Sequence, residues 1–131
     1  MQETGITFDH IHIISENPHA DASWYDDMLG GTIVASHEVR GAPQCVVSFG
    51  GATVIIRGRR PGEELGVRKA LQWGIDHFGF HVAGDFDGFC EKIRRKGAVF
   101  TVEPTDFNPT LRLAFIEGPD GGIIELLQRK E

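Results

Sequence analysis

The chain has 131 residues, of which 40% are hydrophobic and 24% are charged, and its formal net charge is −6 at pH 7. This length is typical of one globular unit with a core, and the composition excludes a disordered protein. The acidic balance argues against a nucleic-acid partner, because binding to a phosphate backbone requires a dense cationic surface. The only basic concentration, Arg57 to Arg60, is short, so we expect a solvated loop there.

Targeting and redox signals are absent from the sequence. No apolar run approaches the roughly 20 residues of a membrane span, and the first five residues lack the charged and apolar regions of a signal peptide. We therefore expect a cytoplasmic protein that does not associate with membranes. Cys45 and Cys90 show no CxxC spacing and no disulfide density, so both are predicted to be buried thiols.

The first half of the chain predicts one helix between strands. Residues 6 to 15 alternate as a strand does, and Asn17 with Pro18 has the residue types of a helix N-cap and first turn. The helix is expected to bury a stripe that includes Trp24 and Met28, and to end at Gly30. Three short strands are then predicted at about 32–40, 44–49 and 52–57, separated by glycine-containing turns.

The second half repeats this order after a linker of residues 58 to 74, in which Glu63 to Gln72 is predicted to be helical. A strand begins at Ile75, and a helix begins near Asp85 with an apolar stripe that includes Cys90 and Ile93. Three strands are predicted at about 98–103, 110–117 and 122–128, interrupted by Pro104, Pro109 and a glycine-rich turn at 118–122.

The two halves share a motif as well as an order of elements. Each begins with an apolar residue, Asp and His, followed by alternating apolar residues, and His10 and His77 are followed at the same distance by Gly30 and Gly97. Such self-similarity indicates a duplicated module. We therefore predict an α+β fold of two βαβββ modules, at about 6–57 and 75–128, within a single domain of residues 1–131.

The repeated histidines are the candidates for chemistry. Because strand side chains alternate, His10 and His12 should share one face, and so should His77 and His81, while the apolar residues between them pack under the helices. Glu125 is the one carboxylate in the apolar run of the last strand, where it needs a partner, solvent or a metal.

Two interpretations of these residues are open. In the first, His10, His77 and Glu125 form a ligand set for Zn²⁺, Mn²⁺, Fe²⁺, Co²⁺ or Ni²⁺ that leaves positions for a substrate. In the second, the histidines are satisfied by backbone groups, and Glu125 pairs with an arginine such as Arg112. The equivalent positions of the two histidines in the repeat favour the metal.

At this point the sequence resembles a known family. The Asp-His strands, the helix end Trp24-Tyr25-Asp26-Asp27-Met28-Leu29-Gly30-Gly31 and the segment Gly118-Pro119-Asp120-Gly121-Gly122-Ile123-Ile124-Glu125 are similar to the vicinal oxygen chelate superfamily. This superfamily includes glyoxalase I, methylmalonyl-CoA epimerase, extradiol dioxygenases, and fosfomycin-resistance and bleomycin-resistance proteins. The resemblance covers about residues 6 to 128.

The resemblance implies a fold, a metal site and an assembly. The two modules would form a cupped, mostly antiparallel sheet around one divalent metal ion, which chelates adjacent oxygens of a small substrate. The ligands would be His10, His77 and Glu125. A homodimer is also implied, in which the metal site forms within one chain or across two.

Two positions depart from the family pattern. The fourth ligand of the glyoxalase and epimerase branches falls in the strand Ala52 to Ile56, where the residues are apolar or Thr53, and the epimerase base falls near Ser48. We therefore expect a three-ligand, metal-dependent lyase or isomerase, with His12 or His81 moving the proton. Two alternatives are a non-haem Fe(II) extradiol-type dioxygenase that uses the same ligands and a metal-free, bleomycin-resistance-like binding protein.

Overall fold

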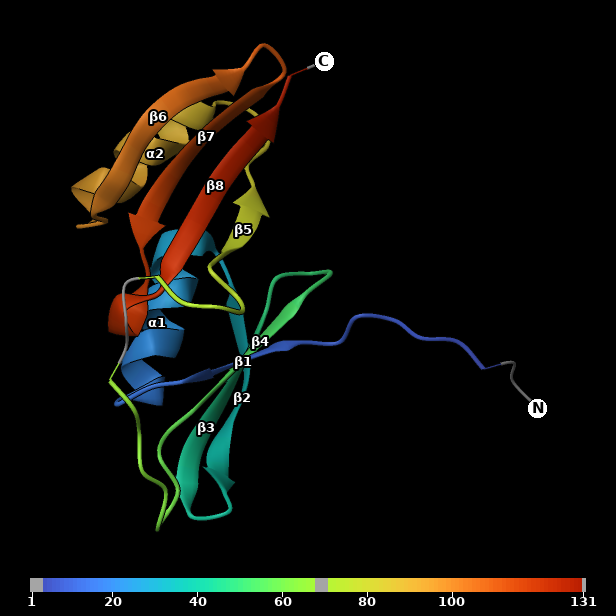
Figure 1. Ribbon diagram of the computed structural model, residues 1–131, viewed down its shortest axis with the longest axis vertical. Helices are drawn as coiled ribbons and strands as arrows, with labels where there is room; N and C mark the ends of the chain where they lie inside the picture. Colours follow the sequence, from blue (N-terminus) through green and yellow to red (C-terminus); the bar gives the residue numbers. More distant parts are fainter. Residues whose placement is uncertain (1–3, 68–70, 131) are drawn as a thin grey trace. The chain divides into compact units, whose positions relative to one another are not determined.

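The computed structural model describes residues 4–67 and 71–130 and divides into two compact units, Met1–Gly66 and Val67–Glu131, which we call module 1 and module 2. Each contains a strand, a helix and three further strands (Figure 1), so the predicted α+β fold of two βαβββ units is confirmed. The elements are β1 (Ile11–Ile14), α1 (Pro18–Leu29), β2 (Thr32–Val39), β3 (Ala42–Ser48), β4 (Thr53–Arg57), β5 (Phe78–His81), α2 (Phe86–Arg95), β6 (Phe100–Asn108), β7 (Leu111–Glu117), the 3₁₀ turn η1 (Pro119–Gly121) and β8 (Ile123–Arg129).

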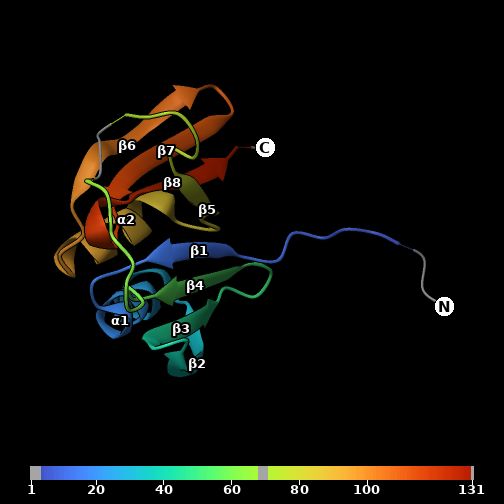
Figure 2. The ribbon, with the colours of Figure 1, turned by 60° about the horizontal axis from the view of Figure 1, so that its bottom comes forward.

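The sheet of module 1 has the strand order β1-β4-β3-β2 (Figure 2). Strand β1 is parallel to β4, and the other pairs are antiparallel. The face toward α1 is buried at Cys45, Val47, Val54 and Ile56, each at most 3% exposed. The alternation of strand side chains puts His12 on the opposite, open face, as predicted.

Helix α1 begins and ends where its residue types predict. The Asn17 side chain accepts a hydrogen bond from the backbone N–H of Ala20, and Gly30 ends the helix in the left-handed region at φ 76°. The buried stripe differs by one residue from the prediction: Tyr25 and Met28 are buried, whereas Trp24 is half-buried. The helix is therefore rotated slightly from the orientation that its largest side chain suggested.

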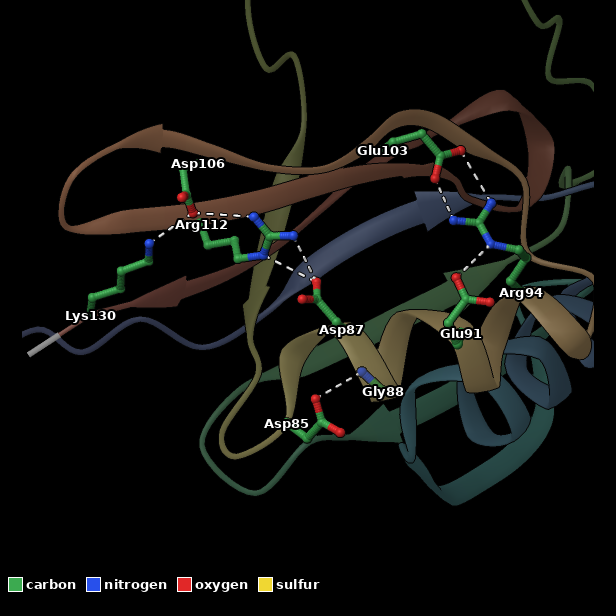
Figure 3. Close-up of polar contacts among 9 residues, drawn as sticks. All are labelled: Asp85, Asp87, Gly88, Glu91, Arg94, Glu103, Asp106, Arg112 and Lys130. Carbon is green, nitrogen blue, oxygen red and sulfur yellow. Dashed lines mark hydrogen bonds and ion pairs between the residues drawn. The ribbon is translucent and has the colours of Figure 1, made fainter.

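The sheet of module 2 has the order β5-β8-β7-β6, with β5 parallel to β8. Helix α2 lies against one face of this sheet (Figure 1) and buries Phe86, Cys90 and Ile93, as predicted. Its N-cap is Asp85, whose carboxylate accepts the backbone N–H of Gly88 at 3.0 Å (Figure 3).

Several strand boundaries differ from the prediction: β1 begins at Ile11 and not at residue 6, and β5 begins at Phe78 and not at Ile75. Strand β6 does not end at residue 103 but continues through Pro104 to Asn108. A proline lacks the N–H for a ladder bond, but β6 is an edge strand and its register shifts between Val102 and Thr105, which accommodates the ring. Strand β3 begins at Ala42, because Arg40 and Gly41, with φ 52° and 83°, form a two-residue turn.

The linker also differs from the prediction. Residues 63–67 and 71–72 are not helical, and residues 68–70 of the expected helix lie outside the described residues. Glu63 instead closes a turn, because its carboxylate accepts two hydrogen bonds from the Arg57 guanidinium, at 2.6 and 3.2 Å, and one from the backbone N–H of Arg60. The Arg57 contact, followed by that of Arg60, lowers the pKa of Glu63 to about 2.

This pairing corrects the view of the basic segment as a solvated loop. The Arg57 side chain is only 15% exposed and is neutralised by Glu63.

Among the described residues, no helix has the length and apolar character needed to cross a membrane.

Candidate metal centre

A histidine and a carboxylate meet on the open face of module 2. His77 immediately precedes β5, and Glu125 lies in β8, directly opposite Gly79 in the parallel pair. His77 Nε2 is 2.9 Å from Glu125 Oε1, although the two residues are far apart in the sequence. Register between β5 and β8 therefore brings together two of the three predicted ligands.

Gly79 is the residue opposite Glu125 in this strand pair. It lies on the same face as Glu125, and a Cβ atom at Gly79 would be 3.4 Å from the Glu125 Cβ and from a Leu127 methyl group. This is ordinary van der Waals contact, so glycine is not required by a clash, but it leaves the face beside Glu125 without a side chain at this position.

A second carboxylate holds the other nitrogen of His77. Nδ1 of His77 is 2.8 Å from Asp76 Oδ2, while Nε2 faces Glu125. The hydrogen bond to Asp76, followed by that to Glu125, raises the pKa of His77, against the opposing effect of burial. A neutral imidazole has one N–H and donates to only one of these carboxylates.

This arrangement fits a metal ion. If Nδ1 of His77 donates to Asp76, Nε2 presents a lone pair toward the Glu125 carboxylate, which is unfavourable unless a proton or cation lies between them. Two ligand atoms about 2.1 Å from one cation and at right angles to each other are about 3.0 Å apart. The observed 2.9 Å matches that separation.

The surroundings of Glu125 explain how a carboxylate is tolerated in this strand. Its side chain is 16% exposed and that of His77 is 31% exposed. The His77 ring packs edge-on against Phe115, with ring centroids 5.0 Å apart. Burial by an aromatic ring restricts solvent, so Glu125 depends on His77 for compensation.

Arg112 is not the partner of Glu125, so that part of the alternative interpretation is wrong. Figure 3 shows the Arg112 guanidinium between two other carboxylates, with hydrogen bonds to Asp87 at 3.0 and 3.1 Å and to Asp106 at 3.2 Å. Because side chains alternate along β7 and Phe115 lies beside Glu125, Arg112 lies on the other face of the sheet. There Asp87 and Asp106 neutralise it.

Module 1 repeats half of this arrangement. Nδ1 of His10 is 2.7 Å from Asp9 Oδ2, and the rings of His10 and His12 are 5.8 Å apart in an edge-on orientation. Burial, followed by the positive charge of Arg57, lowers the pKa of His12. The residue opposite His12 in β4 is Ile55, so this module offers no carboxylate at the position of Glu125.

The remaining predicted site residue, His81, lies outside these contacts and is exposed at the end of β5. Another histidine, His37, is exposed on β2. Within residues 4–67 and 71–130, no group of three or more His, Cys, Asp or Glu side chains is arranged to hold a metal. Asp9 and Asp76 received no role from the sequence, although their repetition before each histidine was the signal that could have assigned one.

A family model described as the Glyoxalase/Bleomycin resistance protein/Dioxygenase superfamily matches residues 7–126. The chain belongs to this superfamily. Its members bind small molecules and commonly use a divalent metal ion. The resemblance to the vicinal oxygen chelate superfamily is therefore confirmed at the level of family and fold.

Individual members of the superfamily are similar over different lengths. Lactoylglutathione lyase from Escherichia coli O157:H7 is 35% identical over 79 residues, which cover 53% of this chain and 58% of that protein. The matched region thus spans little more than half of this curated relative.

Two solved structures share the fold over nearly the whole chain. A glyoxalase family protein from Bacillus cereus has a TM-score of 0.79 at 16% identity and covers 99% of this chain and 98% of that one. A glyoxylase/bleomycin resistance protein/dioxygenase domain from Frankia sp. EAN1pec has a TM-score of 0.76 at 20% identity and covers 99% and 95%.

Proposed function

We propose that this superfamily member is a metal-dependent lyase or isomerase that acts on a small substrate with two adjacent oxygens. The observation that carries the proposal is the contact of His77 Nε2 with Glu125 Oε1 at 2.9 Å, with Nδ1 of the same ring held by Asp76. His77 and Glu125 would bind one divalent cation, and His10, whose Nδ1 is held by Asp9, would supply the third ligand.

The chain's residues divide the chemistry among them. When bound, the cation would supply Lewis-acid stabilisation of negative charge on the substrate oxygens. Asp76 and Asp9 orient the imidazoles, so that each Nε2 is free to coordinate. A ring nitrogen of His12 or His81 would accept the proton from the carbon beside the chelated oxygens and return it to the neighbouring carbon.

The relative at 35% identity suggests the first substrate to test. Because that protein is a lactoylglutathione lyase, S-lactoylglutathione formation is the first reaction to assay. Ile55 occupies the position of Glu125 in module 1, so the proposed site has three protein ligands instead of the four of that branch. Three ligands leave more positions open to substrate or water.

Elemental analysis of the purified chain tests the metal. We expect near-stoichiometric Zn, Mn, Fe, Co or Ni in the wild-type protein and the loss of one metal equivalent per chain in His77→Ala. The matched control is His37→Ala, which removes an exposed histidine from β2 and should retain the metal. Circular dichroism checks that both variants are folded.

Other metal contents would identify the alternative functions. Iron, together with oxygen uptake on a catechol, would replace the lyase or isomerase with an extradiol-type dioxygenase. Wild-type protein that binds no metal after incubation with each cation would overturn the enzyme proposal in favour of a metal-free binding protein. Equal metal content in His77→Ala and wild type would overturn the ligand assignment.

A mixing experiment tests where His10 comes from. We also propose a homodimer, as is common in this superfamily. Co-expressed His10→Ala and His77→Ala chains form mixed dimers in which a site shared between chains is intact once per dimer. If the ligands come from two chains, the mixed dimer regains metal. If they come from one chain, every site in the mixed dimer lacks a ligand and stays empty.

A further inference from the structure

A thiol, a hydroxyl and an imidazole meet on the other face of the module 1 sheet, toward α1. Ser36 in β2 and Cys45 in β3 are paired neighbours in the antiparallel ladder, and His19 reaches them from the first turn of α1. His19 Nδ1 is 3.2 Å from Ser36 Oγ and 3.5 Å from Cys45 Sγ, and the sulfur is 3.6 Å from the hydroxyl oxygen. The three atoms form a closed triangle.

Hydrogen bonding accounts for two of the three edges of this triangle and leaves one short contact without a hydrogen. An imidazole nitrogen carries either a proton or a lone pair, so His19 Nδ1 cannot both donate to one neighbour and accept from the other. At most two of the three contacts can therefore be hydrogen bonds, unless one hydrogen is shared between two acceptors. The Cys45 residue is 1% exposed, so solvent contributes little to its sulfur.

The same three distances suit a cation. With bonds of about 2.3 Å to sulfur and about 2.0–2.1 Å to nitrogen and oxygen, the ligand atoms of a tetrahedral zinc ion are about 3.3–3.6 Å apart. The observed edges run from 3.2 to 3.6 Å. His19 and Ser36 are exposed, so a water molecule has access to a fourth position.

We propose that His19, Ser36 and Cys45 form a second metal site, for a borderline or soft divalent cation such as Zn²⁺. The cation replaces the thiol proton of Cys45, which is released to solvent, and binds the thiolate, the Nδ1 lone pair of His19 and the neutral hydroxyl of Ser36. The site is independent of the proposed enzyme site, whose ligands contain no sulfur and lie in other elements.

Cys90 is the internal comparison. It is also buried, at 0% exposure, but it lies on α2 without an imidazole contact among its described interactions. Burial, followed by the charge of Asp87, raises the pKa of its thiol to about 11. Cys90 is therefore expected to be an inert thiol, and Cys45 a thiol that a metal can deprotonate.

Cobalt(II) titration of the metal-free, full-length protein tests the site. Sulfur ligation gives a near-ultraviolet charge-transfer band that a site of histidines and a glutamate cannot give. We expect this band to saturate at one cobalt per chain in His77→Ala, which lacks a ligand of the proposed enzyme site, and at no more than two in the wild type, and we expect Zn²⁺ to abolish it by displacement. Cys90→Ser and His77→Ala should keep the band, because neither residue belongs to the triangle.

Variants of the triangle decide the outcome. Cys45→Ser should abolish the band, and His19→Gln should weaken cobalt binding at least tenfold, since even outer-shell changes cost about 10–100-fold. His19 is exposed, so His19→Gln remains informative if Cys45→Ser does not fold. No band in the wild type, a band lost in Cys90→Ser, or unchanged affinity in His19→Gln would each overturn the proposal and leave a hydrogen-bonded triangle.

Discussion

The two modules repeat one unit, but they differ at the strand pair that carries the histidines. Both hold a histidine just before the first strand, with Nδ1 on the preceding aspartate at 2.7 or 2.8 Å. Two residues farther on, module 1 has His12 opposite Ile55, whereas module 2 has Gly79 opposite Glu125. The duplicated unit therefore supplies two oriented imidazoles but only one carboxylate.

This difference teaches how an asymmetric site arises from a symmetric scaffold. Position two of the first strand and its partner in the last strand change together: a glycine accompanies the carboxylate, and a histidine accompanies the isoleucine. In module 2 the position opposite the carboxylate carries no side chain. In module 1 the equivalent position carries His12, for which we propose a role in proton transfer.

The largest expected effect is a loss of metal affinity when Glu125 of module 2 is replaced, compared with the replacement of its counterpart in module 1, Ile55. Glu125→Ala should lower the affinity for the proposed metal by more than about 100-fold, because a direct ligand matters more than an outer-shell group. Ile55→Ala, at the equivalent position, should leave the affinity unchanged. Calorimetric titration of both folded variants with the cation found by elemental analysis provides the measurement. Equal losses of affinity would contradict the asymmetry.

A smaller effect is expected where the modules agree. Asp76→Asn and Asp9→Asn should each lower metal affinity by about tenfold, since each carboxylate orients one imidazole through Nδ1. The similar distances, 2.7 and 2.8 Å, predict similar losses in the two variants. Calorimetric titration of both variants provides the measurement. The control is Asp120→Asn, which changes an exposed aspartate in η1. A loss in only one variant would show that the two histidines do not have equivalent roles.

Local features of the fold could be predicted from the sequence. Period-two alternation located the strands and their faces, and Asn17 and Asp85 marked the helix starts at which their side chains now cap the backbone. The predicted strand boundaries were wrong where the position of a strand in the sheet determines how far it extends. Pro104 predicts the end of a strand, but an edge strand such as β6 tolerates a proline. Whether a strand lies at the edge depends on the order of strands in the sheet, which the local sequence does not contain.

The site was predictable only as a set of residue types. The duplicated Asp-His motif identified His10 and His77, but the partner of Glu125 depends on the register of β5 with β8, and a parallel register is not a local property. The same limit explains the wrong choice of Arg112, which two carboxylates from α2 and β6 neutralise. It also explains why the sequence does not reveal the contacts of His19, since β2 and β3 must pair before Ser36 meets Cys45.

The N-caps of the two helices provide a second comparison of the modules, because both helices have one. Each begins with a side-chain cap, Asn17 for α1 and Asp85 for α2, at 3.2 and 3.0 Å from its backbone N–H. Asn17→Ala and Asp85→Ala should each lower the free energy of unfolding by about 1 kcal/mol. Urea denaturation provides the measurement, and a Glu16→Ala variant controls for a change outside the caps. A loss in one variant alone would indicate that the other helix is held by its packing.

The smallest expected effect concerns the ion pairs between α2 and its sheet. In module 2, Arg112 of β7 holds Asp87 of α2, and Arg94 of α2 holds Glu103 of β6 (Figure 3). Arg112→Met should lower the melting temperature by a few degrees at low ionic strength and by less at about 1 M salt, where exposed ion pairs are screened. Arg95→Met, an exposed change of the same kind on α2, should have less effect at either salt concentration.

The effect of Arg112→Met should also depend on pH. Lys130, followed by Arg112, lowers the pKa of Asp106 from its ordinary value of 3.8. A carboxyl group whose pKa is lowered on folding stabilises the fold above its unfolded pKa, and this contribution disappears as the pH falls through the lowered value. The difference between Arg112→Met and wild type should therefore be constant near neutral pH and shrink in strong acid. A difference that persists in strong acid would show that the packing of the Arg112 side chain, and not its charge, attaches α2 to the sheet.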